Sequence, residues 1–177
     1  ITMRLTNTKF KKGYRFYRYP KPFLILLPLI LLALIYFLMP VQAVEISSEN
    51  KTIKIFEVEK KSEIYIDYVH SVAKTPIRDV MEINENHLFL LTRTEYSSFG
   101  AGLPTESAGN FELKNGIYIN SGLDKELELI SLRVGRFADH TLMFEDGRNF
   151  IFRDFLEGGD LVIIKPVQVS KILALIY

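Results

Sequence analysis

Beyond Ala43, apolar residues recur at every second position in a series of short segments. This is the period of a β-strand with one buried face, because successive side chains of a strand point to opposite sides. The segments are rich in Ile, Val, Tyr and Phe and lie between turn residues, at 52–58, 63–69, 79–83, 87–96, 116–120, 127–134, 141–145, 149–152 and 160–169. We therefore predict an all-β fold over residues 44–177, a single antiparallel β-sandwich or barrel-like domain.

Two local patterns refine this prediction. Asp146-Gly147 is the dipeptide of a two-residue hairpin turn, which would place Glu145 opposite Arg148. In segment 127–134 the apolar residues change parity after Leu129, from which we predict a bulge that leaves Ser131 and Arg133 on the exposed face.

The amino end has the pattern of a targeting segment. Residues 1–44 contain seven Lys or Arg and no acidic residue, whereas the rest of the chain carries all 21 acidic residues. An uncharged run, FLILLPLILLALIYFLM, extends from Phe23 to Met39. A charge in the core of a bilayer costs about 3 kcal/mol. An uncharged run of this length therefore indicates membrane insertion. We predict a basic cytoplasmic region over residues 1–22 and a hydrophobic helix over 23–40.

This helix has features of a signal peptide and of an uncleaved anchor. It is short for a membrane span and long for the core of a signal peptide. Val41-Gln42-Ala43 offers small or modest side chains at the two positions that a signal peptidase inspects. The sequence thus fits a single-pass protein of the cell membrane, held there by the helix, and also an exported protein cleaved near Ala43. In both cases the positive-inside rule leaves residues 44–177 outside the cytoplasm.

Composition argues against several classes of protein. The part beyond residue 44 is net acidic, so it lacks the basic face that nucleic-acid phosphates require, and we expect no nucleic-acid partner. The chain has no cysteine, so no disulfide supports its core. Its three histidines, His70, His87 and His140, show no short metal-ligand spacing, and we expect neither a metal site nor a cofactor.

A polar cluster interrupts the strand pattern at HSVAKTPIRDV, residues 70–80. Its candidate ligand- or partner-binding residues are His70, Ser71, Lys74, Thr75, Pro76, Arg78 and Asp79. Read as one strand, the segment places its histidine, its lysine and its arginine on one face, where they could bind an anion. Read as a turn between two strands, its serine and threonine bond to the local backbone. The residues alone leave both interpretations open.

A second polar stretch, SSFGAGLPTESAGN at 97–110, is long for a connection without a function. Its candidate residues are Ser98, Phe99, Gly100, Gly102, Leu103 and Pro104. Two glycines could form a backbone concavity for an anion, but the third glycine and the helix of a nucleotide-binding loop are missing. Strands 77–83 and 87–96 should form a meander that brings both polar segments to one end of the sheet, so we expect His70 to contact residues 97–104.

An enzymatic interpretation is weaker than a binding one. A serine hydrolase would use Ser71 or Ser98 with His70 and Asp79, which supplies the residue types. Neither serine lies in the Gly-x-Ser-x-Gly elbow that exposes a nucleophile. We therefore assign no catalytic residue and favour a protein that is not an enzyme, with the hydrolase as an alternative.

The two polar segments, together with LRVG at 132–135 and HTL at 140–142, resemble the family known as domain of unknown function 1850. The resemblance covers about residues 44–177. It implies signature positions at His70, Ser71, Thr75, Pro76, Phe99, Gly100, Gly102, Leu103 and Pro104. The chain departs from the family pattern at Ala73, where an acidic residue is often found, and at Asp79, where a glutamate is usual. The family offers no established catalytic residue to carry over.

The family comprises small exported bacterial and archaeal proteins that are commonly encoded beside TAXI-type TRAP transporters. The resemblance therefore implies an extracytoplasmic, membrane-associated accessory or binding module, with the transporter's membrane subunit or its binding protein as partner. Arg133, in the LRVG segment, joins the candidate binding residues. A small-anion binder for carboxylates, dependent on Arg78, is a further alternative.

Overall fold

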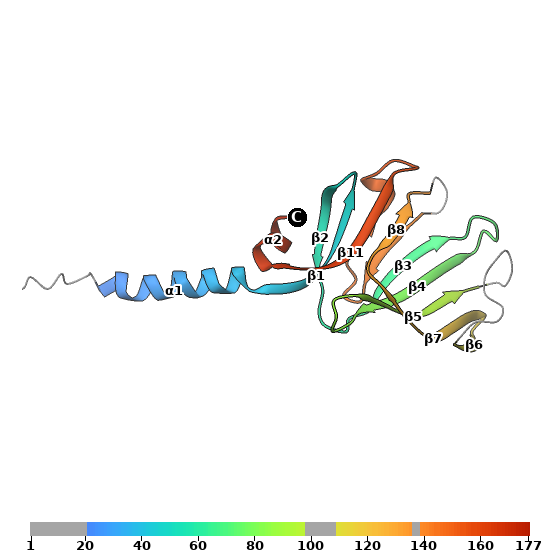
Figure 1. Ribbon diagram of the computed structural model, residues 1–177, viewed down its shortest axis with the longest axis horizontal. Helices are drawn as coiled ribbons and strands as arrows, with labels where there is room; N and C mark the ends of the chain where they lie inside the picture. The colour runs from blue at the N-terminus through green and yellow to red at the C-terminus, as the bar shows by residue number, and fades with distance from the viewer. Residues whose placement is uncertain (1–20, 98–108, 136–138) are drawn as a thin grey trace, which may run out of the picture. The chain divides into compact units, whose positions relative to one another are not determined.

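The computed structural model describes residues 21–97, 109–135 and 139–177 (Figure 1). The chain divides into two compact units, Ile1–Tyr36 and Phe37–Tyr177. Helix α1, Lys21–Leu38, has all but its last two residues in the first unit, lies close to the predicted helix and has Pro28 inside it. Its residues from 24 to 38 are exposed. Within the described part of the chain, no helix reaches both the length and the hydropathy of a membrane span.

The second unit is built from two antiparallel sheets. The smaller sheet has four strands in the order β2-β1-β11-β8. Their bounds are Lys51–Glu57 for β2, Pro40–Ser48 for β1, Leu161–Ser170 for β11 and Ile130–Arg133 for β8. Figure 1 shows β1 between β2 and β11, so both sides of β1 are hydrogen-bonded to neighbours.

The larger sheet has seven strands in the order β10-β9-β3-β4-β5-β7-β6. Their bounds are Asn149–Ile151, Thr141–Phe144, Ile64–Val69, Pro76–Ile83, Phe89–Tyr96, Ile117–Leu127 and Asn110–Lys114 in that order. A 3-10 helix, Phe152–Asp154, follows β10, and a short helix α2, Lys171–Ile176, ends the chain. The predicted meander of β4 and β5 is confirmed, since Ile77 lies opposite Tyr96.

One hydrophobic cluster includes buried side chains of both sheets. Fully buried members include Ile46 of β1 and Ile164 of β11 from the smaller sheet, and Ile64 of β3 and Leu142 of β9 from the larger one. Each such side chain stabilises the fold by about 1.5–3 kcal/mol. The prediction of an all-β fold with antiparallel sheets is confirmed. Neither sheet closes on itself among the described strands, so the barrel alternative is not realised.

The first strand begins earlier than the sequence pattern suggested. β1 starts at Pro40, four residues before the expected start of the β domain at 44. Ala43 is fully buried and lies opposite Glu57 on β2 and Val167 on β11. The residues around the expected cleavage point thus form part of a central strand.

The change of apolar parity near Leu129 has another cause than the predicted bulge. β7 ends at Leu127 in the seven-stranded sheet, and β8 begins at Ile130 in the four-stranded sheet. The bulge prediction is wrong: the chain crosses from one sheet to the other, and the buried face changes with the crossing. Ser131 and Arg133 are exposed, as predicted.

The Asp146-Gly147 hairpin is present, but its predicted register is wrong. The Phe144 N–H donates to the Arg148 carbonyl at 2.9 Å, so Arg148 is paired one residue earlier than expected. Gly147, with φ of 87°, occupies the left-handed region that a three-residue loop requires. Met143 consequently lies opposite Asn149.

Candidate functional site

The polar segment between β3 and β4 is a turn that its histidine holds together. The His70 N–H donates to the Thr75 carbonyl at 2.9 Å, and the Lys74 N–H donates to the His70 carbonyl at 3.0 Å. The Nδ1 atom of the His70 ring accepts the N–H groups of Val72 at 3.3 Å and of Ala73 at 3.0 Å. The imidazole therefore caps the turn, as short polar side chains often do.

This turn lends the hydrolase alternative no geometric support. Ser71 is exposed, and Nδ1 of His70 is already occupied by two backbone N–H groups. Only Nε2 of this ring is left to exchange a proton with a nucleophile. Ser98 lies outside the described residues, so a hydrolase that uses it stays a prediction.

Arg78 lies on β4 and already forms an ion pair within the protein. Its guanidinium makes a two-pronged ion pair with Asp67, the residue opposite on β3, with both N–O distances at 2.7 Å. The guanidinium also lies over the Tyr65 ring, 5.0 Å from its centroid. Hydrogen bonding to Asp67 raises the pKa of Arg78 further above its usual value. Arg78 therefore offers a bound carboxylate less than a solvent-facing arginine would.

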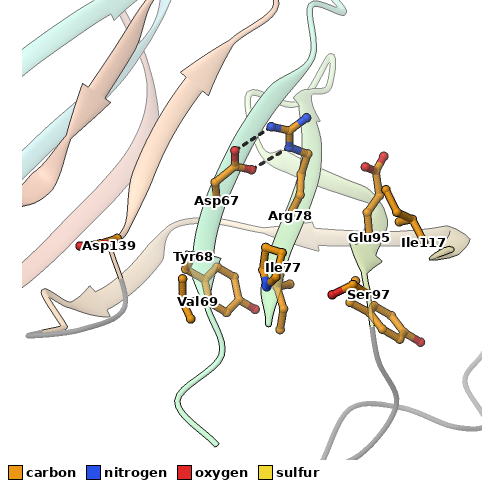
Figure 2. A pocket seen from close by; sticks show the side chains of 11 residues that line it. Asp67, Tyr68, Val69, Ile77, Arg78, Glu95, Ser97, Ile117 and Asp139 are labelled. Carbon is orange, nitrogen blue, oxygen red and sulfur yellow. Dashed lines mark hydrogen bonds and ion pairs between the residues drawn. The ribbon is translucent and has the colours of Figure 1, made fainter. Parts of the chain in front are cut away.

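A surface pocket of about 310 Å³, here the end pocket, is lined by the end of β3, the start of β4 and the end of β5, with Ser97 just beyond β5. Figure 2 shows Tyr68 and Ile77 on neighbouring strands of this pocket, with Ser97 just after the end of the next strand, β5. Each of the acids that line it has an arginine partner within 2.8 Å: Asp67 with Arg78, Glu95 with Arg93, and Asp139 with Arg153.

A second hollow of about 210 Å³, here the inner cavity, shares Tyr68 with the end pocket. Its walls are mostly apolar and come from both sheets: Ile66, Met81, Leu91, Leu127, Ile130 and Leu132. Three of its lining side chains carry polar groups, and they are Tyr68, Asp79 and His140. A few convergent polar groups in an apolar hollow are typical of a small-molecule site.

Asp79 is the acid of the inner cavity. Its Oδ1 accepts the Thr94 hydroxyl at 2.7 Å across the β4–β5 pair, and the Tyr68 hydroxyl also donates to this carboxylate. Burial raises the pKa of Asp79 above its usual value, although the two hydrogen bonds oppose that shift. Among the described residues, no lysine or arginine forms an ion pair with it.

The two aromatic side chains beside Asp79 are electrically neutral. The Tyr68 and His140 rings stack with their centroids 5.7 Å apart. Burial raises the pKa of Tyr68 and lowers that of His140, so the phenol keeps its proton and the imidazole is uncharged near pH 7. The Gly135 N–H lies 3.5 Å from His140 Nδ1 and donates to it. Neither ring therefore supplies a positive charge to the Asp79 carboxylate.

The structure separates the residues that the sequence grouped together. Asp79 lines the inner cavity, and Pro76 and Arg78 line the end pocket, whereas His70 and Lys74 line neither. Arg133 lies on β8 of the other sheet and donates to the Gly159 carbonyl at 3.0 Å. Six candidates lie outside the described residues: Ser98, Phe99, Gly100, Gly102, Leu103 and Pro104. Most of the expected contact between His70 and residues 97–104 lies outside them as well.

Sequence reasoning missed the neighbours of Asp79, namely Tyr68, Thr94 and His140. One signal for this acid was available, since Asp79 shares the parity of the apolar residues Ile77 and Met81. A charged residue on the buried face of a strand is expensive unless it is paired. The Thr94 contact and the presence of His140 in the same cavity depend on tertiary pairing, which no short pattern indicates.

One of three comparisons with known proteins gives a match. A family model described as "Domain of unknown function (DUF1850)" matches residues 64–150, from the start of β3 into β10. Every residue that lines the end pocket or the inner cavity lies in this range. No curated protein and no solved structure matches the chain significantly. Among the described residues, no cluster of His, Asp and Glu could hold a metal ion.

Proposed function

The chain belongs to the DUF1850 family, and we propose that it is an extracytoplasmic binding module held at the membrane by helix α1. We further propose that it serves as an accessory to a TAXI-type TRAP transporter, which is the gene neighbourhood that the family resemblance implies. The observation that carries the binding function is Asp79, a partly buried acid in a mostly apolar cavity beside an open pocket. Perturbed ionisable groups in hollows mark functional sites more often than other positions.

The position of β1 supports permanent attachment to the membrane over release by a signal peptidase. A cut after Ala43 would remove residues 40–43, which pair with β11 from Ser170 to Val167. It would also remove the Gln42 carbonyl, which accepts the Val58 N–H at 2.9 Å, and the fully buried Ala43 side chain. Losing half of a central strand would cost several kcal/mol, a large fraction of the stability of a typical domain.

Attachment is tested by the mass of the mature chain. The intact mass of the protein purified from its native membrane should include residues 40–43 and the helix before them. As a comparison, a chain altered at the expected cleavage position, Ala43→Leu, should have the same amino end as the unaltered chain. A mature chain that begins at Val44 and is released by a salt wash would contradict the proposal.

The partner is tested by co-purification from native membranes after mild crosslinking. The transporter's membrane subunit or its binding protein should be recovered with this chain, and deletion of the chain should impair transport. Recovery of the chain alone, with transport unchanged by the deletion, would contradict the accessory role.

We propose in addition that the two sheets stack face to face as a β-sandwich. The support is the hydrophobic cluster, which includes Ile46 and Ile164 of one sheet with Ile64 and Leu142 of the other. The methyl groups of Ile46 should then give nuclear Overhauser effects with side chains that pack around Ile64, and the methyl groups of Ile64 with side chains that pack around Ile46. Their absence from the spectra of the folded chain would contradict a sandwich.

A further inference from the structure

The inner cavity indicates what kind of molecule the module binds. Building on the proposed binding function, we propose that this cavity takes a small molecule with an apolar body and a protonated amino group, and that the ammonium pairs with the Asp79 carboxylate.

The charge of Asp79 is the first reason. Its described hydrogen-bond partners, the hydroxyls of Thr94 and Tyr68, are both neutral. An ionised carboxylate accepts about four hydrogen bonds, so it has capacity for further donors. A partly buried carboxylate whose described partners are all neutral is costly to ionise, and an entering ammonium would supply a positive charge. An alcohol could supply a donor but no charge, and a carboxylate ligand would add repulsion.

The shape and the walls of the inner cavity are the second reason. An engineered apolar cavity of about 150 Å³ holds one benzene molecule. The inner cavity, at about 210 Å³, is larger by roughly the space of a methylene and an amino group. Its aliphatic walls, such as Leu91 and Leu132, favour a hydrocarbon body, while Asp79 and the Tyr68 hydroxyl bonded to it provide polar groups close together. A ligand the size of benzylamine matches the volume of the cavity and has one apolar and one polar part.

The test compares three probes of one shape and different charge: benzylamine, benzyl alcohol and benzoate. The full chain, in detergent micelles, is titrated while the methyl signals of Met81 and Leu91 are followed by NMR. Benzylamine should shift these signals saturably and bind more tightly than benzyl alcohol, and benzoate should not bind. In Asp79→Asn, benzylamine should bind about tenfold more weakly, the usual scale for one lost charge-assisted contact, and benzyl alcohol should be unaffected.

Two further variants complete the design. Asp146→Asn makes the same chemical change in the exposed β9–β10 loop, far along the chain from the cavity, and should leave benzylamine binding unchanged. Leu91→Phe adds volume to the cavity wall and should weaken benzylamine and benzyl alcohol alike, which keeps the test informative if Asp79→Asn folds poorly.

Three results would overturn the inference. Equal benzylamine affinity in the unaltered chain and in Asp79→Asn would remove the ammonium–carboxylate contact. Tighter binding of benzoate than of benzylamine would reverse the ligand class and leave a binding module for anions. No saturable shift with any probe would identify the inner cavity as a packing void. Loss of the accessory role in the crosslinking experiment would leave each of these measurements valid, so the two proposals fail separately.

Discussion

The two faces of the seven-stranded sheet treat their acidic residues differently. On the face turned away from the hydrophobic cluster, Asp67 is paired with Arg78, and both Glu63 and Glu95 are paired with Arg93. On the opposite face, Asp79 has two hydroxyl partners and, among the described residues, no cation. The outer acids form the ordinary ion pairs of a partly exposed surface, whereas the inner acid lies where charge is expensive. The contrast suggests that Asp79 is kept for a reason other than stability.

The two faces should also respond to pH in opposite directions. Hydrogen bonding to Arg93 lowers the pKa of Glu63 below 4.5, so its contribution to stability is present above pH 4.5 and is lost as the pH falls. Burial raises the pKa of Asp79 above 3.8, so folding disfavours its ionised form. The free energy of unfolding therefore carries no penalty from Asp79 below pH 3.8, and it falls as the pH rises through the folded pKa of this residue.

The largest expected effect comes from removing the donor that Asp79 relies on. Thr94→Val should lower the free energy of unfolding by about 2 kcal/mol, because a hydrogen bond to a partly buried charge is lost. Thermal unfolding of the full chain in detergent micelles, followed by circular dichroism, measures the change. Thr92→Val is the matched control, since that hydroxyl donates at 3.1 Å to the neutral Val80 carbonyl and should cost less. Equal losses in the two variants would contradict the special position of Asp79.

Neutralising the inner acid should have a smaller effect of the opposite sign. Asp79→Asn retains an acceptor for Thr94 and Tyr68 but removes a charge that has no cation partner among the described residues, so it should stabilise the fold at pH 7 by about 1 kcal/mol. The gain should shrink as the pH falls and vanish below about 3.8, where the unaltered side chain is itself protonated in both states. Melting curves of both proteins across this pH range test the sign. A destabilised Asp79→Asn at pH 7 would show that its charge is compensated.

The smallest effect is expected on the outer face. Arg93→Met keeps most of the apolar stem but leaves Glu63 and Glu95 unpaired, and should cost about 0.5 kcal/mol because these groups are partly exposed. Unlike the effects at Asp79, this cost should fall in high salt and disappear when the two glutamates are protonated. Melting temperatures in low and high salt check it. An Arg93→Met loss that ignored salt would argue for a packing role instead.

Much of the fold followed from the alternation of apolar residues. β2, β3, β5, β9, β10 and β11 all lie within two residues of predicted segments, because each buries one face against the hydrophobic cluster. β6 was missed because all its residues are exposed, which leaves no alternation to detect. β1 was missed because its start, PVQAVE, also has the composition of a cleavage region. Local composition cannot separate these two roles, whereas strand pairing can.

The candidate site was predictable only in part. Asp79 was among the predicted residues, but as a member of a polar cluster with His70 and Lys74, which the structure places in a turn. Its actual neighbours come from three other places along the chain: Tyr68 on β3, Thr94 on β5 and His140 before β9. Such neighbours are set by the register of the sheet, and the sequence carried that information only as the parity of single residues.

The most direct test of this contrast is a titration of the Asp79 carboxyl carbon by NMR in the full chain. The carbon should titrate with a midpoint above 3.8, while that of Glu63 titrates below 4.5 in the same spectra. Addition of benzylamine should then lower the Asp79 midpoint, because a bound ammonium favours the ionised form. An Asp79 midpoint at or below 3.8 in the free protein would mean that its charge is already compensated, and would contradict the assignment of this acid as the ligand-binding group.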